Sequence, residues 1–174
     1  MEMNLTDTLL AVFGGIFTVL ALASIVGAVL KLRLAPAAPQ DTVDNLNARI
    51  KAWWVMILLI AGAIWTGKGG VIALFAFISF QCLREFVSLT HTRRGDHHAL
   101  QWSFFFFLPL QYYLIAIDWY GLFSILIPVY AFLAIPVAAA LAGDPERFLE
   151  RNAKIQWGIM VCVYGLSHAP ALLL

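Results

Sequence analysis

Long apolar runs separated by short polar loops dominate this 174-residue sequence and limit the folds open to it. A helix needs about 20 apolar residues to cross the hydrocarbon core of a bilayer. Hydrophobic residues make up 62% of the chain and its mean hydropathy is +0.85, which excludes a water-soluble core. The pattern predicts an all-α, polytopic membrane helix bundle that forms a single transmembrane domain over residues 1–174. About six transmembrane helices are predicted, at residues 9–30, 52–66, 71–89, 102–117, 122–142 and 155–174.

Basic residues predict the orientation of these spans, because cytoplasmic loops carry an excess of Lys and Arg. With the N-terminus outside, the only basic residue in an outer loop is Lys68. The inner side then holds Lys31, Arg33, Arg49, Lys51, Arg84, Arg93, Arg94, Arg147, Arg151 and Lys154. The leading residues carry Glu2 and Asp7 and no basic residue, which argues against a cleaved signal peptide. We therefore predict a multi-pass protein of the inner (cytoplasmic) membrane.

Two local features modify this scheme. The second half of the loop 31–51 continues into DTVDNLNARIKAWW, residues 41–54, which is predicted to form a short amphipathic helix ahead of a short second span. Pro128 and Pro136 lie within the fifth span and are predicted to kink it, since proline cannot donate a backbone hydrogen bond.

One predicted span carries a polar stripe near its inner end. Gln81, Arg84, Glu85 and Ser88 follow the i, i+3, i+4, i+7 spacing that places residues on one helix face. An ionised side chain at mid-bilayer costs roughly 2.5–3.5 kcal/mol on insertion scales, so such groups normally turn toward the protein interior. The stripe is either a structural polar clamp, with Arg84 extended toward the interface, or part of a ligand-binding wall.

The predicted inner face gathers most of the remaining polar side chains. Arginines beside a membrane suit phosphate or anionic headgroups, because the guanidinium group binds phosphate oxygens in bidentate fashion. Alternatively, these charges only set the topology. The residues concerned are Arg49, Arg84, Glu85, His91, Arg93, Arg94, Asp96, His97, His98 and Arg147.

The sequence offers little support for a metal site, for other catalytic motifs or for nucleic-acid binding. Asp96, His97 and His98 are adjacent and lack the spaced partners of a metal site, and no catalytic triad, phosphate-binding loop or dinucleotide motif occurs. Cys82 and Cys162 lie inside predicted spans and are interpreted as packing residues. His168 is either a core histidine or a polar group facing a substrate. The net charge of +1 and the lack of a basic run argue against nucleic acid as a partner.

Several motifs in register resemble the integral-membrane phosphatidate cytidylyltransferase (CDP-diacylglycerol synthase) family, most closely its shorter bacterial branch. The resemblance covers almost the whole chain. It is carried by NLNARIKAWWVM (Asn45–Met56), CLREF (Cys82–Phe86), TRRGDHHAL (Thr92–Leu100), WYGLFSILIPVYAF (Trp119–Phe132), GDPERFLERNAKIQWG (Gly143–Gly158) and SHAPALL (Ser167–Leu173).

The resemblance implies an enzyme of phospholipid biosynthesis, a nucleotidyltransferase that converts CTP and phosphatidate into CDP-diacylglycerol and pyrophosphate. It also implies Mg²⁺ on the phosphates and, in some members, a homo-oligomer. The family's C-terminal signature, a Ser-x-x-Lys run followed by acidic residues and glycines, is not found here. We therefore expect the chain to be the N-terminal part of a longer protein, without catalytic residues or Mg²⁺ ligands of its own.

The function predicted from the sequence is thus the membrane-embedded part of a phosphatidate cytidylyltransferase. The alternative is a non-catalytic membrane module that binds lipid or a partner protein; a small transporter is a weaker hypothesis, since no inverted repeat is evident. The residues predicted to bind the headgroup or line a polar cavity wall are Arg49, Gln81, Arg84, Glu85, Arg93, Arg94 and His168.

Overall fold

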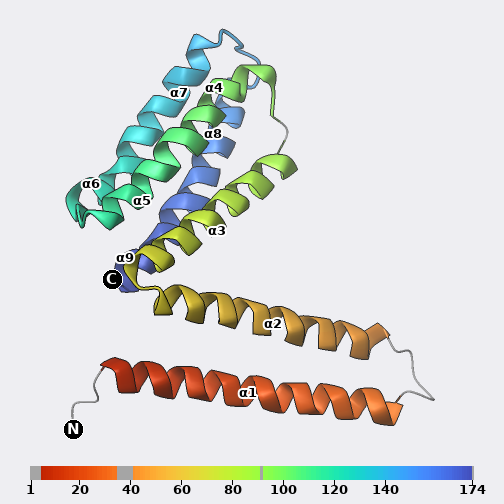
Figure 1. Cartoon of the computed structure of the whole chain (residues 1–174). Helices are drawn as coiled ribbons and strands as arrows, with labels where there is room; N and C mark the ends of the chain where they lie inside the picture. The colour runs from red at the N-terminus through yellow and green to blue at the C-terminus, as the bar shows by residue number, and fades with distance from the viewer. Residues whose placement is uncertain (1–4, 35–40, 91, 174) are drawn as a thin grey trace. The chain divides into compact units, whose positions relative to one another are not determined.

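The computed structural model describes residues 5–34, 41–90 and 92–173, and every regular element within them is a helix (Figure 1). The predicted all-α fold class is therefore confirmed. The elements are α1 (Leu5–Leu34), α2 (Asp41–Trp65), α3 (Lys68–Leu89), η1 (Arg94–Asp96), α4 (His97–Trp102), η2 (Ser103–Phe107), α5 (Leu108–Ala116), α6 (Tyr120–Ile125), η3 (Leu126–Ala131), α7 (Phe132–Leu141), α8 (Phe148–Ile159), η4 (Met160–Gly165) and α9 (Leu166–Leu173).

Five helices in the described part of the chain are long and apolar enough to cross a membrane. They match the first five predicted spans and cover Leu10–Leu32, Thr42–Trp65, Lys68–Leu89, His97–Ala116 and Tyr120–Leu141. The sixth predicted span, 155–174, falls in the helical run made by α8, η4 and α9. This run is not among the five, and its first turns carry charged residues such as Glu150 and Lys154.

The second span differs most from its prediction. Residues 41–54 were expected to form a separate amphipathic helix, whereas α2 runs without interruption from Asp41 to Trp65. Neither Gly nor Pro occurs between Asp41 and Ala61, so nothing in the sequence ends a helix there. The polar first turns and the apolar segment are therefore one helix. Pro36 and Pro39 of the predicted loop lie outside the described residues.

Prolines coincide with local widening of the helices in two spans. Pro128 lies within the π-helical segment η3, and Pro109 follows the π-helical segment η2. A proline lacks the N–H of the regular ladder, and π-helical turns are one way a helix accommodates that loss. Pro136, by contrast, lies inside the α-helical segment α7.

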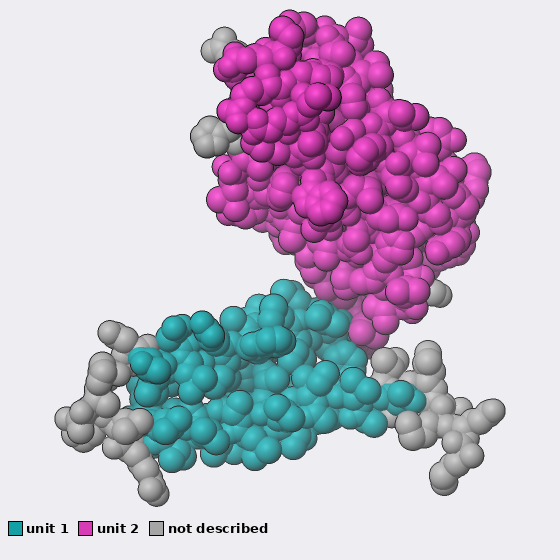
Figure 2. All heavy atoms as spheres, turned by 180° about the vertical axis from the view of Figure 1, so that it is seen from behind, with its two compact units in different colours: residues 1–61 teal, residues 62–174 magenta. Residues whose placement is uncertain are grey.

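The chain divides into two compact units, Met1–Ala61 and Gly62–Leu174 (Figure 2). In unit 1, α1 packs against the first part of α2. The indole Nε1 of Trp54 donates to Ser24 Oγ at 3.0 Å, the Trp54 and Phe17 rings are 5.6 Å apart, and Lys31 pairs with Asp44 at 2.9 Å. The prediction that residues 1–174 form one transmembrane domain stays a prediction.

Unit 2 contains the main hydrophobic core, contributed by α3 to α9. Its most buried side chains include Leu83, Leu114, Phe123, Ile127, Ile135 and Ile159. Buried hydrogen bonds join its helices: the hydroxyls of Tyr112 and Ser79 are 2.5 Å apart, and Gln111 Nε2 donates to Ser167 Oγ at 3.2 Å. Inside a bilayer such pairs satisfy polar groups that lipid cannot, so they align α5 with α3 and α9.

A glycine allows α8 to lie close to α3 (Figure 1). A Cβ atom at Gly158 would stand 2.7 Å from two ring carbons of Phe86. Small residues allow helices to pack closely in membranes, where dispersion contacts rather than water exclusion drive association. This contact positions the charged start of α8, where the candidate site begins.

Candidate functional site

The buried guanidinium of Arg151, in the first turns of α8, joins two loops. Its side chain is only 6% exposed. Arg151 Nη1 donates to Asp144 Oδ2 at 2.6 Å, and Nη2 donates to the Asp144 carbonyl oxygen at 3.0 Å. Arg151 Nε lies 3.0 Å from Asp96 Oδ1, an ion pair by distance whose N–H is not aligned for a hydrogen bond. Arg151 therefore ties Asp96, just before α4, to Asp144, between α7 and α8.

Arg93 adds a second link between the same loops. Its backbone N–H donates to Asp96 Oδ2 at 2.9 Å. Its guanidinium pairs with Glu146, and Nη1 lies 3.8 Å from Asp144 Oδ2. Gly95 favours the close approach of the two loops, because a Cβ atom there would stand 3.1 Å from the Asp144 Cβ, a tight contact. We call Arg93, Asp96, Asp144, Glu146 and Arg151 the charge clasp.

The electrostatics of the two loops favour the ionised forms of their carboxyls. The hydrogen bond from Arg151, followed by one from the Glu146 backbone N–H, lowers the pKa of Asp144. Lys154 and then Arg147 lower the pKa of Glu150 in the same way. The hydrogen bond to Glu146 raises the pKa of Arg93. At neutral pH these groups therefore carry full charges that largely neutralise one another.

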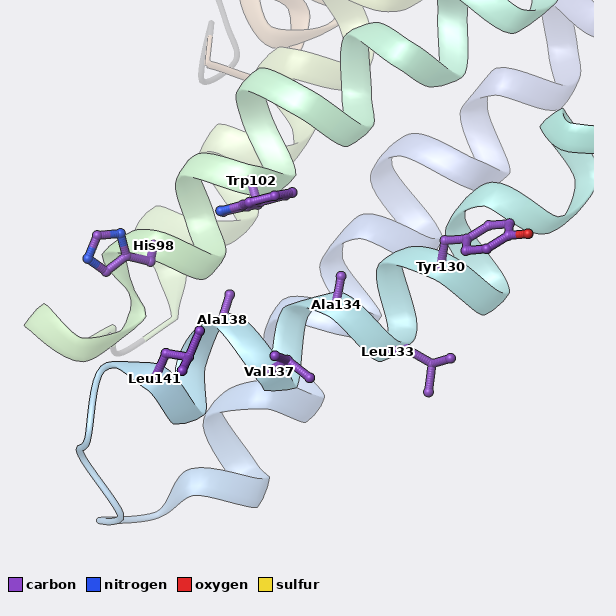
Figure 3. Close-up of a pocket in the computed structure, with 8 residues that line it drawn as sticks. All are labelled: His98, Trp102, Tyr130, Leu133, Ala134, Val137, Ala138 and Leu141. Carbon is purple, nitrogen blue, oxygen red and sulfur yellow. The ribbon is translucent and has the colours of Figure 1, made fainter.

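An apolar groove of about 560 Å³ begins beside the charge clasp and runs along α7 (Figure 3). His98 and Leu141 lie at the clasp end, and Tyr130 and Leu133 lie at the other end. The lining residues come from α4, η3 and α7 and are His98, Trp102, Tyr130, Leu133, Ala134, Val137, Ala138 and Leu141. We call this the α4–α7 groove.

The predicted site residues do not converge. Arg93 belongs to the charge clasp, and Arg94 lies in η1 with its side chain outside the described residues. Gln81, Arg84 and Glu85 are exposed on α3, and their side chains make no ion pair or hydrogen bond to any described residue. Arg49 is exposed on α2, in unit 1. Binding roles for these residues stay predictions.

His168 has close partners on its own helical run and on α6. Its Nδ1 lies 2.7 Å from the Tyr164 carbonyl oxygen, and its ring is 4.5 Å from that of Tyr164 and 5.0 Å from that of Phe123. These contacts hold the partly buried imidazole within the packing of unit 2. A role facing a substrate stays a prediction.

Sequence reasoning did not single out Asp144, Glu146 or Arg151 for the site. The available signal was that the two most charge-rich loops, around 92–98 and 143–154, fall on the same predicted side of the membrane. Opposite charges in neighbouring loops can pair, but the sequence does not say which. The structure also buries Asn152 beside Arg151, and no described group hydrogen-bonds either of its side-chain polar atoms.

The acidic side chains of these two loops are held in ion pairs. Mg²⁺ needs oxygen ligands in near-octahedral geometry, usually one or two free carboxylates with waters and phosphates. The carboxylates of Asp96, Asp144, Glu146 and Glu150 each lie in an ion pair with arginine or lysine. No cluster of three or more His, Cys, Asp or Glu suited to a metal occurs in the part of the chain that was placed.

A sequence model described as the cytidylyltransferase family matches residues 47–174. The chain belongs to the cytidylyltransferase family. The match covers most of α2 and all of α3 to α9, so it includes the charge clasp and the α4–α7 groove. The resemblance inferred from the sequence motifs is thereby confirmed at the level of this family.

A comparison with a curated protein adds a relative of similar sequence. The chain is 31% identical over 159 residues to YnbB, an uncharacterized protein of Escherichia coli (strain K12). The aligned region covers 91% of this chain and 50% of YnbB, so the chain spans about half the length of this relative. No solved structure matches the chain. The apolar helices of the described residues indicate a membrane protein.

Proposed function

We propose that this chain is the membrane-embedded part of a CTP:phosphatidate cytidylyltransferase, which makes CDP-diacylglycerol for phospholipid biosynthesis in the inner (cytoplasmic) membrane. One observation carries the proposal: the segment that matches the cytidylyltransferase family contains helices long and apolar enough to cross a membrane. A nucleotidyltransferase with this architecture is best placed to meet an acceptor that resides in the bilayer. Phosphatidate is the acceptor that the motif resemblance suggests.

The proposed reaction transfers a cytidylyl group. A phosphate oxygen of phosphatidate attacks the α-phosphorus of CTP, the bond from that phosphorus to the bridging oxygen breaks, and pyrophosphate leaves with the electron pair. Both reactants are anionic, so cations must offset their repulsion. In this chain Arg49, Arg84, Arg93 and Arg94 are proposed to attract the lipid phosphate. Arg49 and Arg84 are the stronger of these candidates, because no described acidic side chain pairs with either, whereas Arg93 pairs with Glu146.

The Mg²⁺ implied by the motif resemblance is assigned to no residue here. The loop carboxylates are engaged by Arg93, Arg147, Arg151 and Lys154, and a carboxylate held in an ion pair is a poor ligand for a second cation. We propose that magnesium ligands come from other parts of the assembled enzyme. This chain would then supply the membrane scaffold and the lipid-facing surface.

The test is a transfer assay on the protein expressed from its complete reading frame and kept in native membranes. Radiolabelled CTP and phosphatidate should yield labelled CDP-diacylglycerol, and diacylglycerol, which lacks the phosphate, should yield none. Arg84→Ala should raise KM for phosphatidate about tenfold, as expected for the loss of roughly 1.4 kcal/mol of binding, and leave KM for CTP unchanged. Arg147→Ala is the matched control, since Arg147 pairs with Glu150.

The outcomes separate the proposal from its alternative. Absence of labelled product from well-folded protein, together with saturable binding of phosphatidate, would replace the enzyme by a non-catalytic lipid-binding module. Equal kinetics for Arg84→Ala and wild type would remove Arg84 from the headgroup site. If Arg84→Ala protein is lost from the membrane, Arg84 is a structural residue.

A further inference from the structure

The α4–α7 groove has the shape of a site for an extended apolar chain. Ala134 and Ala138 lie four residues apart on α7, hence on one helix face, and both line the groove. Their small side chains leave it open between the bulkier Leu133, Val137 and Leu141 (Figure 3). A volume of about 560 Å³ is within the range of small-molecule sites. The floor of the groove is therefore apolar.

The length of the groove matches one leaflet of a bilayer. From Tyr130 to Leu141 is eleven helical steps, or about 16 Å at a rise of 1.5 Å per residue. The hydrocarbon core of a bilayer is about 30 Å thick, so this length is roughly half of it. Because Leu141 is the last residue of a helix long and apolar enough to cross a membrane, we infer that the groove extends from the interface to about the midplane. Lipid acyl chains in one leaflet occupy the same depth.

The interfacial end of the groove suits an anionic headgroup. His98 lines this end, is exposed, and has no hydrogen bond or ion pair to any described residue. The acidic side chains of the adjoining charge clasp do not compete for it, because Arg93 and Arg151 already engage them. A ring N–H of His98 can donate a hydrogen bond to a phosphate oxygen placed there.

We propose that the α4–α7 groove binds one acyl chain of a lipid phosphomonoester, with the phosphate at His98. The inference rests on the proposed function, since phosphatidate is the lipid that the transfer reaction would use. It names the surface that holds the acyl chain, which the reaction itself does not specify. A bulk anionic phospholipid shares the acyl and phosphate chemistry, so the experiment must distinguish the two sources.

The experiment is photo-cross-linking of the complete protein in phosphatidylcholine nanodiscs, without CTP. The probe is phosphatidate with a diazirine midway along one acyl chain, and matched probes are phosphatidylglycerol and diacylglycerol with the same diazirine. Peptide mapping should place the phosphatidate label on Trp102 or on residues 130–141. Unlabelled phosphatidate should compete this label away, and unlabelled phosphatidylglycerol should compete about tenfold less well, equivalent to roughly 1.4 kcal/mol.

Two variants test the geometry. A134L/A138L fills the groove and should reduce labelling about tenfold, whereas Ala140→Leu, on the same helix but outside the groove, should not change it. His98→Ala should weaken labelling by the phosphatidate probe and leave labelling by diacylglycerol unchanged. The label positions on the unaltered protein test the assignment even if A134L/A138L fails to fold.

The failure of this inference is distinguishable from failure of the proposed function. Label spread over the exposed faces of α1 and α2, or equal labelling by all three probes, would overturn the groove assignment whether or not CDP-diacylglycerol is made. Groove labelling selective for phosphatidate, in a protein that makes no CDP-diacylglycerol, would support the groove and refute the transfer activity.

Discussion

Replacing Arg151 by methionine would remove the cation that ties the two loops of the charge clasp while keeping a side chain of similar length. The change leaves Asp96, whose side chain is 2% exposed, without its ion-pair partner. It also removes two hydrogen bonds from Asp144, one to the carboxylate and one to the carbonyl oxygen. The buried carboxylate of Asp96 would then keep the hydrogen bond from the Arg93 backbone N–H but have no cation paired with it.

The size of the expected stability loss follows from how deeply the Arg151–Asp96 ion pair is buried. Removing one partner of a buried ion pair typically costs about 3–5 kcal/mol, because the remaining charge is left desolvated. Asp144 is 29% exposed, so water can replace part of what it loses. We therefore expect Arg151→Met to lower the free energy of unfolding by about 3 kcal/mol, at the lower end of that range. This is a large fraction of the 5–15 kcal/mol that holds a typical domain folded.

Arg147 supplies a matched control in the same segment. It pairs with Glu150, and their side chains are 67% and 41% exposed. Exposed pairs contribute about 0–1 kcal/mol, so Arg147→Met should change the free energy of unfolding by no more than that. Equilibrium unfolding in mixed detergent micelles, followed by circular dichroism, measures both variants under the same conditions.

A double-mutant cycle with Asp96→Asn isolates the pair. The double variant with Asp96→Asn and Arg151→Met lacks both charges. Its loss in free energy of unfolding should be smaller than the sum of the two single losses, with a coupling energy of about 1–3 kcal/mol. Equal unfolding free energies for Arg151→Met and Arg147→Met, or additive single changes in the cycle, would refute the assignment of the charge clasp as a buried structural link.

Two further predictions follow from local geometry and charge. Because the pKa of Asp144 is lowered on folding, its contribution to stability is fully present above its unfolded pKa of about 3.9 and is lost as the pH falls through the lower, folded value. The difference in unfolding free energy between wild type and Asp144→Asn should therefore be constant at neutral pH and shrink below pH of about 4; a difference that persists in acid would contradict this. Gly158→Ala places a Cβ atom 2.7 Å from the Phe86 ring, whereas at Gly165 the nearest atom is 3.6 Å away. In the same unfolding assay Gly158→Ala should be less stable than Gly165→Ala by about 1–3 kcal/mol, and equal stabilities would show that Phe86 moves aside freely.

Much of the fold was predictable because a bilayer leaves few choices. Lipid cannot hydrogen-bond backbone groups, so a long apolar run must be helical whatever packs against it. The spans predicted at 9–30, 71–89 and 122–142 accordingly match helices in the structure. The extent of α2 was not predicted, because the change from polar to apolar composition at Ala52 was interpreted as an element boundary, and composition alone does not end a helix.

The site was predictable only in part. The spacing of Gln81, Arg84 and Glu85 correctly indicates a shared helix face, but periodicity does not say which way that face points once helices pack. Within the described residues this stripe is exposed, and the buried charges are Asp96 and Arg151 instead. Arg93 was selected as a phosphate ligand from its residue type, whereas the structure pairs its guanidinium with Glu146.

By itself the sequence determined the helical membrane class, the approximate positions of the spans and the cytidylyltransferase motifs. All of these depend on composition and local order along the chain. Only the tertiary structure decided that Arg151 lies between Asp96 and Asp144, and that α4 and α7 leave an apolar groove beside them. Those features join residues far apart in the chain, and the pairing of distant charges depends on how the helices pack and not on the local sequence around each residue.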